Sequence, residues 1–294
     1  MKIRVAAARH RIREPRDFAT FASRIEAAVA HAVAQGAQVI VLPEYLALEA
    51  AAMLPVATRR DFVATLAALQ ATRADFLALA SDLAHRHAVY LAFGTFLLDL
   101  GGRYRNRAFF AGPGRALAWQ DKLTLTGFER ASAVIEPGDA LKVFDTAFGR
   151  VAIQVCYDVE FPLHARAQAE AGARLVLVPS CTDTVAGATR VRIGCQARAL
   201  ENQLHVACSV TAGEAPWSPA LDVNAGDAAV YTPIDRGFPS DGIAAQAGPE
   251  VDWAIADIDL DAIDALRRDG QVANADDWPR QLRPALLRAR VERV

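Results

Sequence analysis

Three residues whose side chains could carry out acyl transfer each follow or end an apolar, strand-like run. Glu44 comes after "VIVLP", Lys122 ends "RALAWQDK", and Cys156 comes after "RVAIQV". A thiol is mostly protonated at neutral pH and becomes an effective nucleophile when a cation and a base lie beside it. Lys122 can supply the cation. A carboxylate at the mouth of a buried strand, such as Glu44, is expected to have a raised pKa that suits a general base.

Each of these side chains also has a purely structural interpretation. A glutamate in the position of Glu44 can be solvated at the start of a loop, and Lys122 can pair with Asp121 on the surface. Glu129 follows in the segment "WQDKLTLTGFER", where it can orient Lys122, share in proton transfer, or form a surface ion pair. The combination of a thiol, a cation and two carboxylates favours the catalytic interpretation over the separate ones.

The remaining histidines and cysteines do not indicate a rival centre. His164 and His205 lack the matching Asn or Asp context of a Cys-His hydrolase. His85 and His87 point to different faces of a helix, which disfavours a metal site there. The sequence contains no C-x-x-C pair, so neither a zinc knuckle nor a thioredoxin-type motif is predicted. Three cysteines are expected to pack as small apolar side chains, namely Cys181, Cys195 and Cys208.

The elements that position these residues begin with a strand, "KIRVAAA", and a helix from about residue 17 to Gly36. "AQVIVLPEY" is a short continuous apolar run and predicts a buried strand that ends at Glu44. Helical periodicity extends from about residue 50 to 88. Three strands joined by tight turns then form a meander, "VYLAFGTFLL", "YRNRAFFAGP" and "RALAWQDK".

The second half of the chain repeats this alternation of strands and helices. A hairpin around Phe148 and Gly149 leads to Cys156, and a helix is predicted from about residue 162 to 171. The strand "ARLVLVPS", the helix "ATRVRIGCQARALENQ" and the strand "LHVACSV" follow. A Gly/Pro/Asp-rich loop over 211–227 and two further strands are expected next, the clearer of them being "EVDWAIADIDL".

An internal repeat links the two halves. "AQGAQVIVLPEY" (Ala34–Tyr45) resembles "EAGARLVLVPSC" (Glu170–Cys181), and each copy has a further strand ahead of its helix. Two strand–helix–strand units predict a pseudo-symmetric α/β sandwich with parallel strands and outer helices. Sites in such sheets form beyond the C-terminal ends of strands, which is where Glu44 and Cys156 are expected.

Composition restricts the function further. The chain has 294 residues, of which 53% are hydrophobic and 22% charged, with a formal net charge of -2. This balance indicates a globular protein and argues against broad nucleic-acid binding or attachment to anionic membranes. No apolar stretch is expected to reach the ~20 residues that cross a bilayer. The N-terminal sequence returns to charge too soon for a secretory signal, so a cytoplasmic protein with reduced thiols is predicted.

Taken together, the segments "VLPEY", "QDKLTLTGFER" and "VAIQVCYDVEFP" resemble the three catalytic blocks of the nitrilase superfamily, the carbon–nitrogen hydrolases, in the same order and spacing. The later "ARALENQLHVACSV" is also similar. The resemblance extends from the first strand to about Ile258. It implies a four-layer α-β-β-α sandwich with internal pseudo-symmetry, usually dimerised, and a Glu-Lys-Cys triad that needs no metal or organic cofactor.

The resemblance also implies a role for each residue. Cys156 would be the nucleophile and Glu44 the general base. Lys122 and the backbone N–H of Tyr157 would stabilise the oxyanion, and Glu129 would be the supporting carboxylate. The expected reaction converts a small amide to an acid and ammonia through a thioester. A catalytically silent scaffold, a nitrile- or carbamoyl-specific hydrolase, and a metal-dependent or redox protein are the alternatives.

The block "CYDVEFP" is closer to the amidase branches than to nitrilases proper, which resemble "CWE" after the nucleophile. Glu160 stands where related amidases often have arginine, which argues against an omega-amidase-like carboxylate substrate. Five residues are predicted to line the substrate pocket, namely Tyr45, Phe128, Tyr157, Glu160 and Thr182. Residues 1–275 are predicted to form one domain, and residues 276–294 an arm at the subunit interface of a homodimer or higher homo-oligomer.

Overall fold

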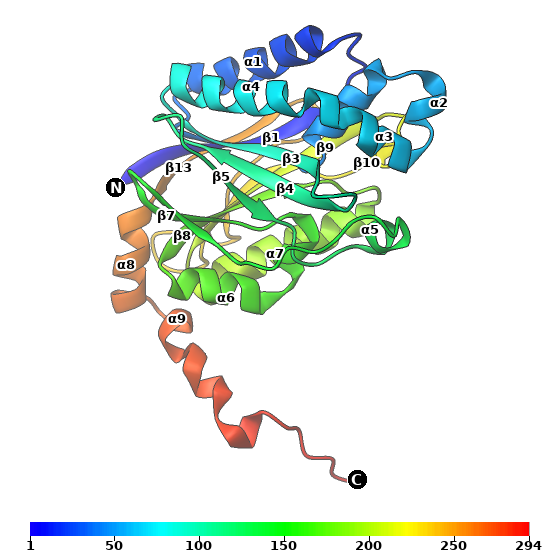
Figure 1. Ribbon diagram of the computed structural model, residues 1–294. Coiled ribbons are helices and arrows are strands. Elements are labelled where there is room, and N and C mark those ends of the chain that lie inside the picture. The colour runs from blue at the N-terminus through cyan, green and yellow to red at the C-terminus, as the bar shows by residue number, and fades with distance from the viewer. Residues whose placement is uncertain (294) are drawn as a thin grey trace.

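The computed structural model describes residues 1–293, which form two β-sheets packed face to face with helices on both outer sides (Figure 1). Three parallel strands open the first half, and two antiparallel strands continue it. In order across the sheet these are β1 (Lys2–Arg11), β2 (Val39–Leu42), β3 (Tyr90–Asp99), β4 (Tyr104–Ala111) and β5 (Leu117–Asp121). β13 (Trp253–Asp259) pairs antiparallel with β1 on its other side.

The second half has the same plan, so the predicted repeat is confirmed. Three parallel strands are again followed by two antiparallel ones. They are β7 (Gly149–Ile153), β8 (Ala173–Ser180), β9 (His205–Glu214), β11 (Ala229–Tyr231) and β12 (Ile243–Gln246). β6 (Val143–Thr146) forms the predicted hairpin with β7. The two halves join where residues 9–11 of β1 pair with residues 210–212 of β9.

The helices complete the four layers. α1 (Phe18–Ala34) and α4 (Arg73–Arg86) cover the first sheet, and α6 (Pro162–Glu170) and α7 (Val185–Asn202) cover the second (Figure 1). Between β2 and β3 the chain also forms η1 (Leu46–Met53), α2 (Val56–Arg59), α3 (Phe62–Leu69) and η2 (Gln70–Thr72). Polar caps start the long helices, since the Asp17 side chain accepts a hydrogen bond from Thr20 N and that of Thr184 from Gly187 N.

Continuous apolar strands form because both faces of each sheet are covered. Val39 and Val41 of β2 belong to the core between the two sheets, whereas the alternate residues Ile40 and Leu42 pack under the helices of the first sheet. Side chains alternate across a strand, so each run supplies two cores at once. Because each strand is packed on both faces, its end and the residues that follow it are held in fixed positions.

Three expectations about individual segments were wrong, and one helix was missed. β9 continues to Glu214 and pairs with β10 (Val223–Asn224), so the stretch 211–227 is not all loop. Three strands follow it instead of two, because β11 and β12 continue the second sheet before β13. α8 (Leu260–Asp269) was not predicted, although Asp259 caps it and Ile263 and Leu266 are buried on one side.

The third wrong expectation concerns membranes, because the helical run Phe62–Arg86 is long and apolar enough to cross one by length and composition. The short helix η2 interrupts this run between α3 and α4. Phe76, Ala80 and Leu83 of α4 are buried in the core over the first sheet. The run is therefore an outer-layer element of the sandwich, with its apolar face turned to the sheet.

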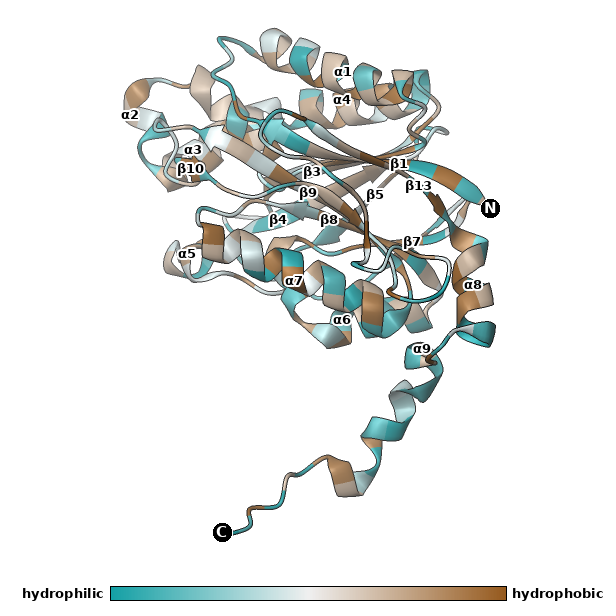
Figure 2. Ribbon diagram, turned by 180° about the vertical axis from the view of Figure 1, so that it is seen from behind, coloured by the Kyte–Doolittle hydropathy of each residue, from teal (hydrophilic) through white to brown (hydrophobic). Residues whose placement is uncertain are grey.

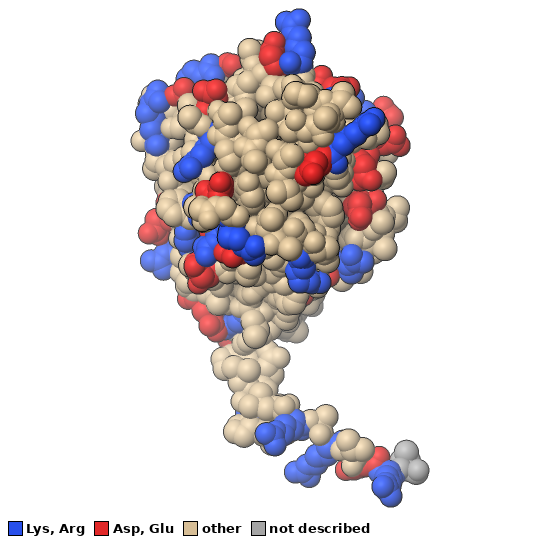
Figure 3. Space-filling model, turned by 45° about the vertical axis from the view of Figure 1, so that its right-hand side comes forward, with Lys and Arg blue, Asp and Glu red and all other residues tan. Residues whose placement is uncertain are grey.

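The last part of the described chain leaves the sandwich. After α9 (Asn274–Asp277), the short helices η4 (Trp278–Leu282) and η5 (Pro284–Leu286) extend away from α6 and α8 (Figure 1). Hydrophobic and hydrophilic residues are mixed along this C-terminal arm (Figure 2). Basic side chains lie along its outer part (Figure 3). The arm is attached near its start, where Arg166 donates to the Ala275 carbonyl at 3.0 Å and lies over the Trp278 ring.

Candidate active site

The ends of β2, β5 and β7 bring Glu44, Lys122 and Cys156 to one place between the sheets. All three side chains are almost completely buried, with exposed fractions of 1%, 1% and 4%. The Lys122 ammonium lies 2.8 Å from Glu44 Oε1, although the two residues come from strands far apart in the sequence. Surface pairing of Lys122 with Asp121 is excluded, because Asp121 instead binds Arg107 through both carboxylate oxygens at 2.6 and 2.9 Å.

Glu129 holds Lys122 from the other side, with Oε2 2.8 Å from the ammonium. The helix α5 (Gly127–Ala131) positions this carboxylate through a capping box. Thr126 N donates to Glu129 Oε2 at 2.8 Å, and the Thr126 hydroxyl accepts from Glu129 N at 3.3 Å. The capping pattern T-G-F-E is visible in the sequence and indicates where this carboxylate must point.

Asn106 is a member of the site that the sequence reasoning missed. It is fully buried on β4 and donates from Nδ2 to Glu44 Oε1 at 2.8 Å and to Glu129 Oε1 at 3.0 Å. The Tyr45 hydroxyl donates to the same Glu129 oxygen at 3.0 Å. A signal for Asn106 exists, because "YRNRAFF" places an amide at an inward position of a strand, where an apolar residue would otherwise stand.

Burial and neighbouring charges shift the pKa values of Glu44 and Glu129 in opposite directions. Burial raises the pKa of Glu44, and the Lys122 ammonium opposes only part of this rise. Burial would also raise the pKa of Glu129, but Lys122 and the hydrogen bonds from Thr126 and Asn106 bring it below the ordinary value. Glu44 is therefore the carboxylate suited to accept a proton, and Glu129 the one that stays ionised.

The same charges keep Lys122 protonated. Burial alone would lower its pKa, but Glu44 and Glu129 more than offset this, and the pKa lies well above its ordinary value. The Cys156 thiol is in the opposite situation. Burial and the Glu44 charge raise the pKa of Cys156 well above its usual range, while Lys122 lowers it in part. The resting site therefore contains a neutral thiol, an ammonium and an ionisable base.

Cys156 lies at a sharp turn from β7 into the helix η3 (Cys156–Glu160). Its φ of 49° is in the left-handed region, which non-glycine residues seldom adopt away from functional sites. The thiol donates to the Cys181 carbonyl at 3.4 Å and accepts from the Ser180 hydroxyl at 3.2 Å. The backbone N–H of Cys181 donates to Glu44 Oε2 at 3.1 Å. The end of β8 therefore orients both the thiol and the base.

The turn that carries Glu44 is held in a similar way. Tyr45 has a φ of 61°, and its N–H donates to the Thr95 hydroxyl at 2.8 Å. A Cβ on Gly94, whose φ is 62°, would lie 2.3 Å from the Pro43 carbonyl oxygen. Only glycine at position 94 permits this close approach of β3 to the turn.

Asp158 connects the lysine segment to the nucleophile and was also missed. Its buried carboxylate accepts from Thr124 N at 2.7 Å, Leu123 N at 3.1 Å and Val155 N at 3.3 Å. Burial raises the pKa of Asp158, and the backbone donors lower it in part. One carboxylate thus ties the residues after Lys122 to the residue before Cys156.

A cavity of about 290 Å³ opens onto Glu44, Lys122 and Cys156. All five residues predicted to contact substrate line it, namely Tyr45, Phe128, Tyr157, Glu160 and Thr182. The Thr182 hydroxyl donates to the Ala225 carbonyl at 2.6 Å, so only its oxygen lone pairs are free to accept from a ligand. The structure brings the predicted residues together, and their catalytic and binding roles stay predictions.

The other cysteines differ in position. Cys181 lines the same cavity, and burial raises its pKa to about 12, whereas Cys195 and Cys208 are buried in the core of the second sheet. The expectation that Cys181 merely packs as an apolar side chain was therefore incomplete. Within residues 1–293, no group of three or more His, Cys, Asp or Glu side chains is placed to hold a metal ion.

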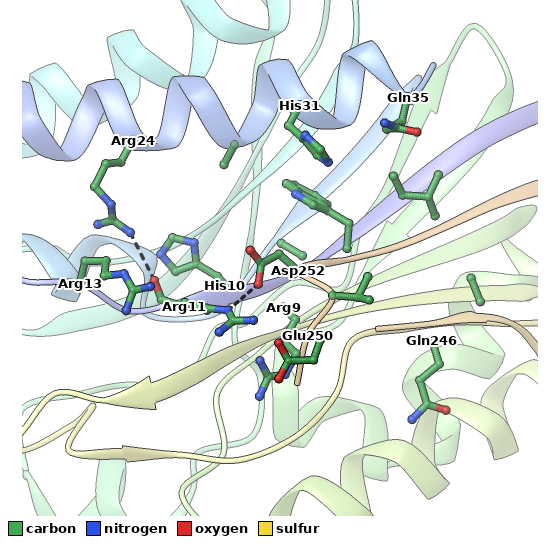
Figure 4. A pocket seen from close by; sticks show the side chains of 16 residues that line it. Arg9, His10, Arg11, Arg13, Arg24, His31, Gln35, Gln246, Glu250 and Asp252 are labelled. Atoms are coloured by element: carbon green, nitrogen blue, oxygen red, sulfur yellow. Dashed lines mark hydrogen bonds and ion pairs between the residues drawn. The ribbon is translucent and has the colours of Figure 1, made fainter. Parts of the chain in front are cut away.

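A larger cavity, of about 870 Å³, lies elsewhere and shares no lining residue with the cavity at Cys156. Figure 4 shows its basic side chains, several of which already have partners. Arg11 pairs with Asp252 at 2.6 Å, and Arg24 pairs with the buried Glu49, which also binds His10. The larger of the two cavities is therefore not the one that Glu44, Lys122 and Cys156 line.

Two curated proteins give partial alignments. "Probable hydrolase YhcX" of Bacillus subtilis is 35% identical over 190 residues, which cover 64% of this chain and 37% of that protein. "Omega-amidase NIT2" of Bos taurus is 30% identical over 177 residues, which cover 58% of this chain and 61% of that protein. The aligned part thus spans less than two thirds of the length of each relative.

Solved structures agree over most of the chain. Nit3 of Saccharomyces cerevisiae, a member of branch 10 of the nitrilase superfamily, superposes with a TM-score of 0.71 at 22% identity, over 91% of this chain and 93% of that one. The Nesterenkonia AN1 amidase, also from the nitrilase superfamily, gives a TM-score of 0.68 at 25% identity, over 91% and 95%. The family model for the carbon-nitrogen hydrolases matches residues 4–268. This chain therefore belongs to the carbon-nitrogen hydrolase family, within the nitrilase superfamily.

Proposed function

We propose that this protein is a cysteine-dependent amidase that converts a small linear amide to an acid and ammonia through a thioester. The observation that carries the proposal is the convergence of Glu44, Lys122 and Cys156 at one buried cavity, with Lys122 2.8 Å from the glutamate. A scaffold protein has no chemical need for a buried ammonium between two carboxylates beside a strained cysteine.

The first half of the reaction forms the thioester. The Cys156 sulfur attacks the amide carbon while its proton passes to Glu44. The oxyanion is stabilised by the Lys122 ammonium and by Tyr157 N–H, which has no acceptor within the helix because Tyr157 is its second residue. Glu44 then gives the proton to the amide nitrogen, the C–N bond breaks, and ammonia leaves.

The second half releases the acid. Water adds to the thioester carbon as Glu44 takes one of its protons. The C–S bond breaks, the acid departs, and the proton returns from Glu44 to the sulfur. Glu44 alternates between acid and base throughout, which suits its raised pKa, while Glu129 keeps Lys122 in place.

Amides are favoured over nitriles because a departing nitrogen must be protonated, which a base such as Glu44 can do. The relatives described as omega-amidase and amidase support the same choice. An ammonia-release screen over short aliphatic amides, omega-amides, carbamoyl amines and nitriles tests it. The best amide is expected to exceed its nitrile of equal chain length in kcat/KM. A nitrile that equals or exceeds its amide contradicts the assignment, and a carbamoyl amine that exceeds every amide favours that alternative.

We also propose that the protein works as a homodimer in the cytoplasm, with residues 276–294 at the subunit interface. Several apolar side chains of this arm are exposed on the isolated chain, among them Leu282, Leu286 and Leu287. A second copy of the chain would remove them from water.

A further inference from the structure

The charges at the mouth of the catalytic cavity are mainly acidic. Besides the catalytic groups, the lining contains three carboxylates, Glu160, Asp183 and Asp222, and one guanidinium, that of Arg190. Asp183 and Asp222 are exposed and Glu160 is half-buried, whereas Cys156 is buried, so the excess of negative charge lies toward the solvent side of the cavity. The end of a bound amide opposite the scissile bond would lie on that side. A cleft lined by one sign of charge concentrates ligands of the other sign.

Glu160 is the innermost of these carboxylates. It ends the helix η3 that Cys156 begins, and a 3₁₀-helix rises ~2 Å per residue, so the two residues are separated by roughly 8 Å along the axis. Its side chain is 20% exposed, which leaves it partly desolvated. It therefore lies at a fixed distance from the nucleophile, as a recognition group for the far end of a short substrate would.

Besides Lys122, Arg190 is the one cation among the described lining residues, and it could oppose this assignment. Its Nε lies 3.5 Å from Glu160 Oε1, and its side chain is 61% exposed at the rim. A substrate carboxylate that bound Arg190 would have to break its ion pair with Glu160. It would then lie near the three carboxylates of the lining. A substrate cation needs only to replace a solvent-exposed guanidinium that is already held loosely.

The aromatic lining of this cavity suits a chain of methylene groups. Tyr157 and Phe128 line the same cavity as Cys156 and Glu160, and the Tyr157 ring is held edge-on against Phe161, with ring centroids 5.0 Å apart. Aromatic rings bury methylenes and attract a nearby organic cation through their faces. Shape and charge therefore point to the same kind of ligand.

We propose that the substrate is a linear amide whose far end carries an organic cation such as a protonated amine, and that Glu160 is the specificity-determining residue. This inference rests on the proposed amidase function and adds the charge class of its substrate.

Three amides with the same methylene chain test it. The amides of δ-aminovaleric and hexanoic acids and the monoamide of adipic acid end in an ammonium, a methyl and a carboxylate group. We expect kcat/KM to be at least about tenfold higher for the ammonium amide than for the methyl amide, as one favourable charge contact can give, and lowest for the carboxylate amide. Glu160→Gln should bring the ammonium-to-methyl ratio close to one, mainly by raising KM for the ammonium amide.

Two variants serve as controls. Arg190→Gln should maintain or increase the ratio, because it removes the competing cation. Glu170→Gln replaces an exposed glutamate of α6 that pairs with Arg166, and should leave all three amides unaffected. Thermal melting of each variant checks the fold.

The outcomes separate this inference from the function on which it rests. Equal hydrolysis of the ammonium and methyl amides, unchanged by Glu160→Gln, would overturn the inference and leave the amidase function in place. Preference for the carboxylate amide, lost in Arg190→Gln, would overturn it in favour of an anionic substrate. Absence of ammonia release from every amide in the wider screen would overturn both.

Discussion

At the scale of single residues, the feature that organises the site is one ammonium between two unlike carboxylates. Glu44 and Glu129 both contact Lys122 at 2.8 Å, yet their pKa values move in opposite directions. Glu129 accepts additional hydrogen bonds from Thr126 and Tyr45, whereas Glu44 faces the thiol and the cavity. Hydrogen bonds to the ionised form stabilise it, so the local donors decide which carboxylate remains an anion.

The pH profile of Glu129→Gln tests this division of roles. Glu44 must be ionised to take the thiol proton, so activity is present above its raised pKa and is lost as the pH falls through it. The charge of Glu129 is one cause of the rise, and removing it should shift the acid limb of kcat/KM to lower pH. The plateau should also fall, on the order of a hundredfold, because Lys122 loses one of its two anchors.

A matched control is Glu136→Gln, which removes a half-exposed glutamate paired with Arg103. It should change neither the limb nor the plateau. An acid limb that stays in place in Glu129→Gln, or moves to higher pH, would contradict the electrostatic assignment.

Cys156→Ala should abolish turnover while the protein stays folded, because the change removes the nucleophile and leaves only a small cavity. Ammonia release and thermal melting measure the two effects. Cys195→Ala and Cys208→Ala should retain most activity. Cys181→Ala should retain most as well, because its backbone and not its thiol contacts Glu44 and Cys156. Comparable loss in any of these three would mean that the nucleophile has been misassigned.

At the scale of elements, the site depends on connections between strand ends that belong to different halves of the fold. Asp158 of η3 accepts three backbone hydrogen bonds and joins the segment after β5 to the end of β7. Thr95 and Gly94 of β3 fix the turn after β2. These contacts set the relative positions of base, cation and nucleophile more firmly than the strands alone.

Asp158→Ala should therefore lower both stability and activity. One buried and two partly buried N–H groups lose their acceptor, which we expect to cost about 3 kcal/mol of unfolding free energy in urea titration. Asp158→Asn should lose less, since its amide oxygen can still accept. Asp145→Ala, at an exposed position of β6, is the control and should behave like the parent protein. A stable Asp158→Ala variant with full activity would show that the connection is dispensable.

At the scale of the whole molecule, two exposed features lie on the side of the second sheet. Leu163 of α6 and Val185 and Ile193 of α7 are exposed on the helical layer, and the arm extends from the same side (Figure 1). In the described residues after Trp278, the hydrogen bonds of the arm stay within the arm. Apolar surface of this kind is expected to be covered by a partner, for which a second copy of the chain is our candidate.

A chain that ends at Ala275 should accordingly dissociate. Sedimentation velocity is expected to show a dimer or larger assembly for the full chain and a monomer for the shortened one. Because truncation can disturb α9, a full-length variant with Leu282→Ser and Leu286→Ser should weaken association without removing the arm. A monomeric full-length protein, or an unchanged assembly in both variants, would refute the role of the arm.

The sequence by itself determined the order of elements as far as β9, the repeat and the chemical residues at the strand ends. Each of these depends on local patterns, such as the apolar runs before Glu44 and Cys156. Resemblance of the three blocks then identified the family, which the comparisons confirm.

Only the tertiary structure decided which groups support Glu44, Lys122 and Cys156. Asn106 and Asp158 act on residues distant in the chain, and the backbone of Cys181 reaches Glu44 across the two halves. The left-handed turn at Cys156 and the opposite pKa shifts of the two carboxylates likewise depend on packing. Local sequence sets where a strand ends, but burial and hydrogen-bond partners come from segments that meet only when the sheets pack, because desolvation depends on the whole neighbourhood.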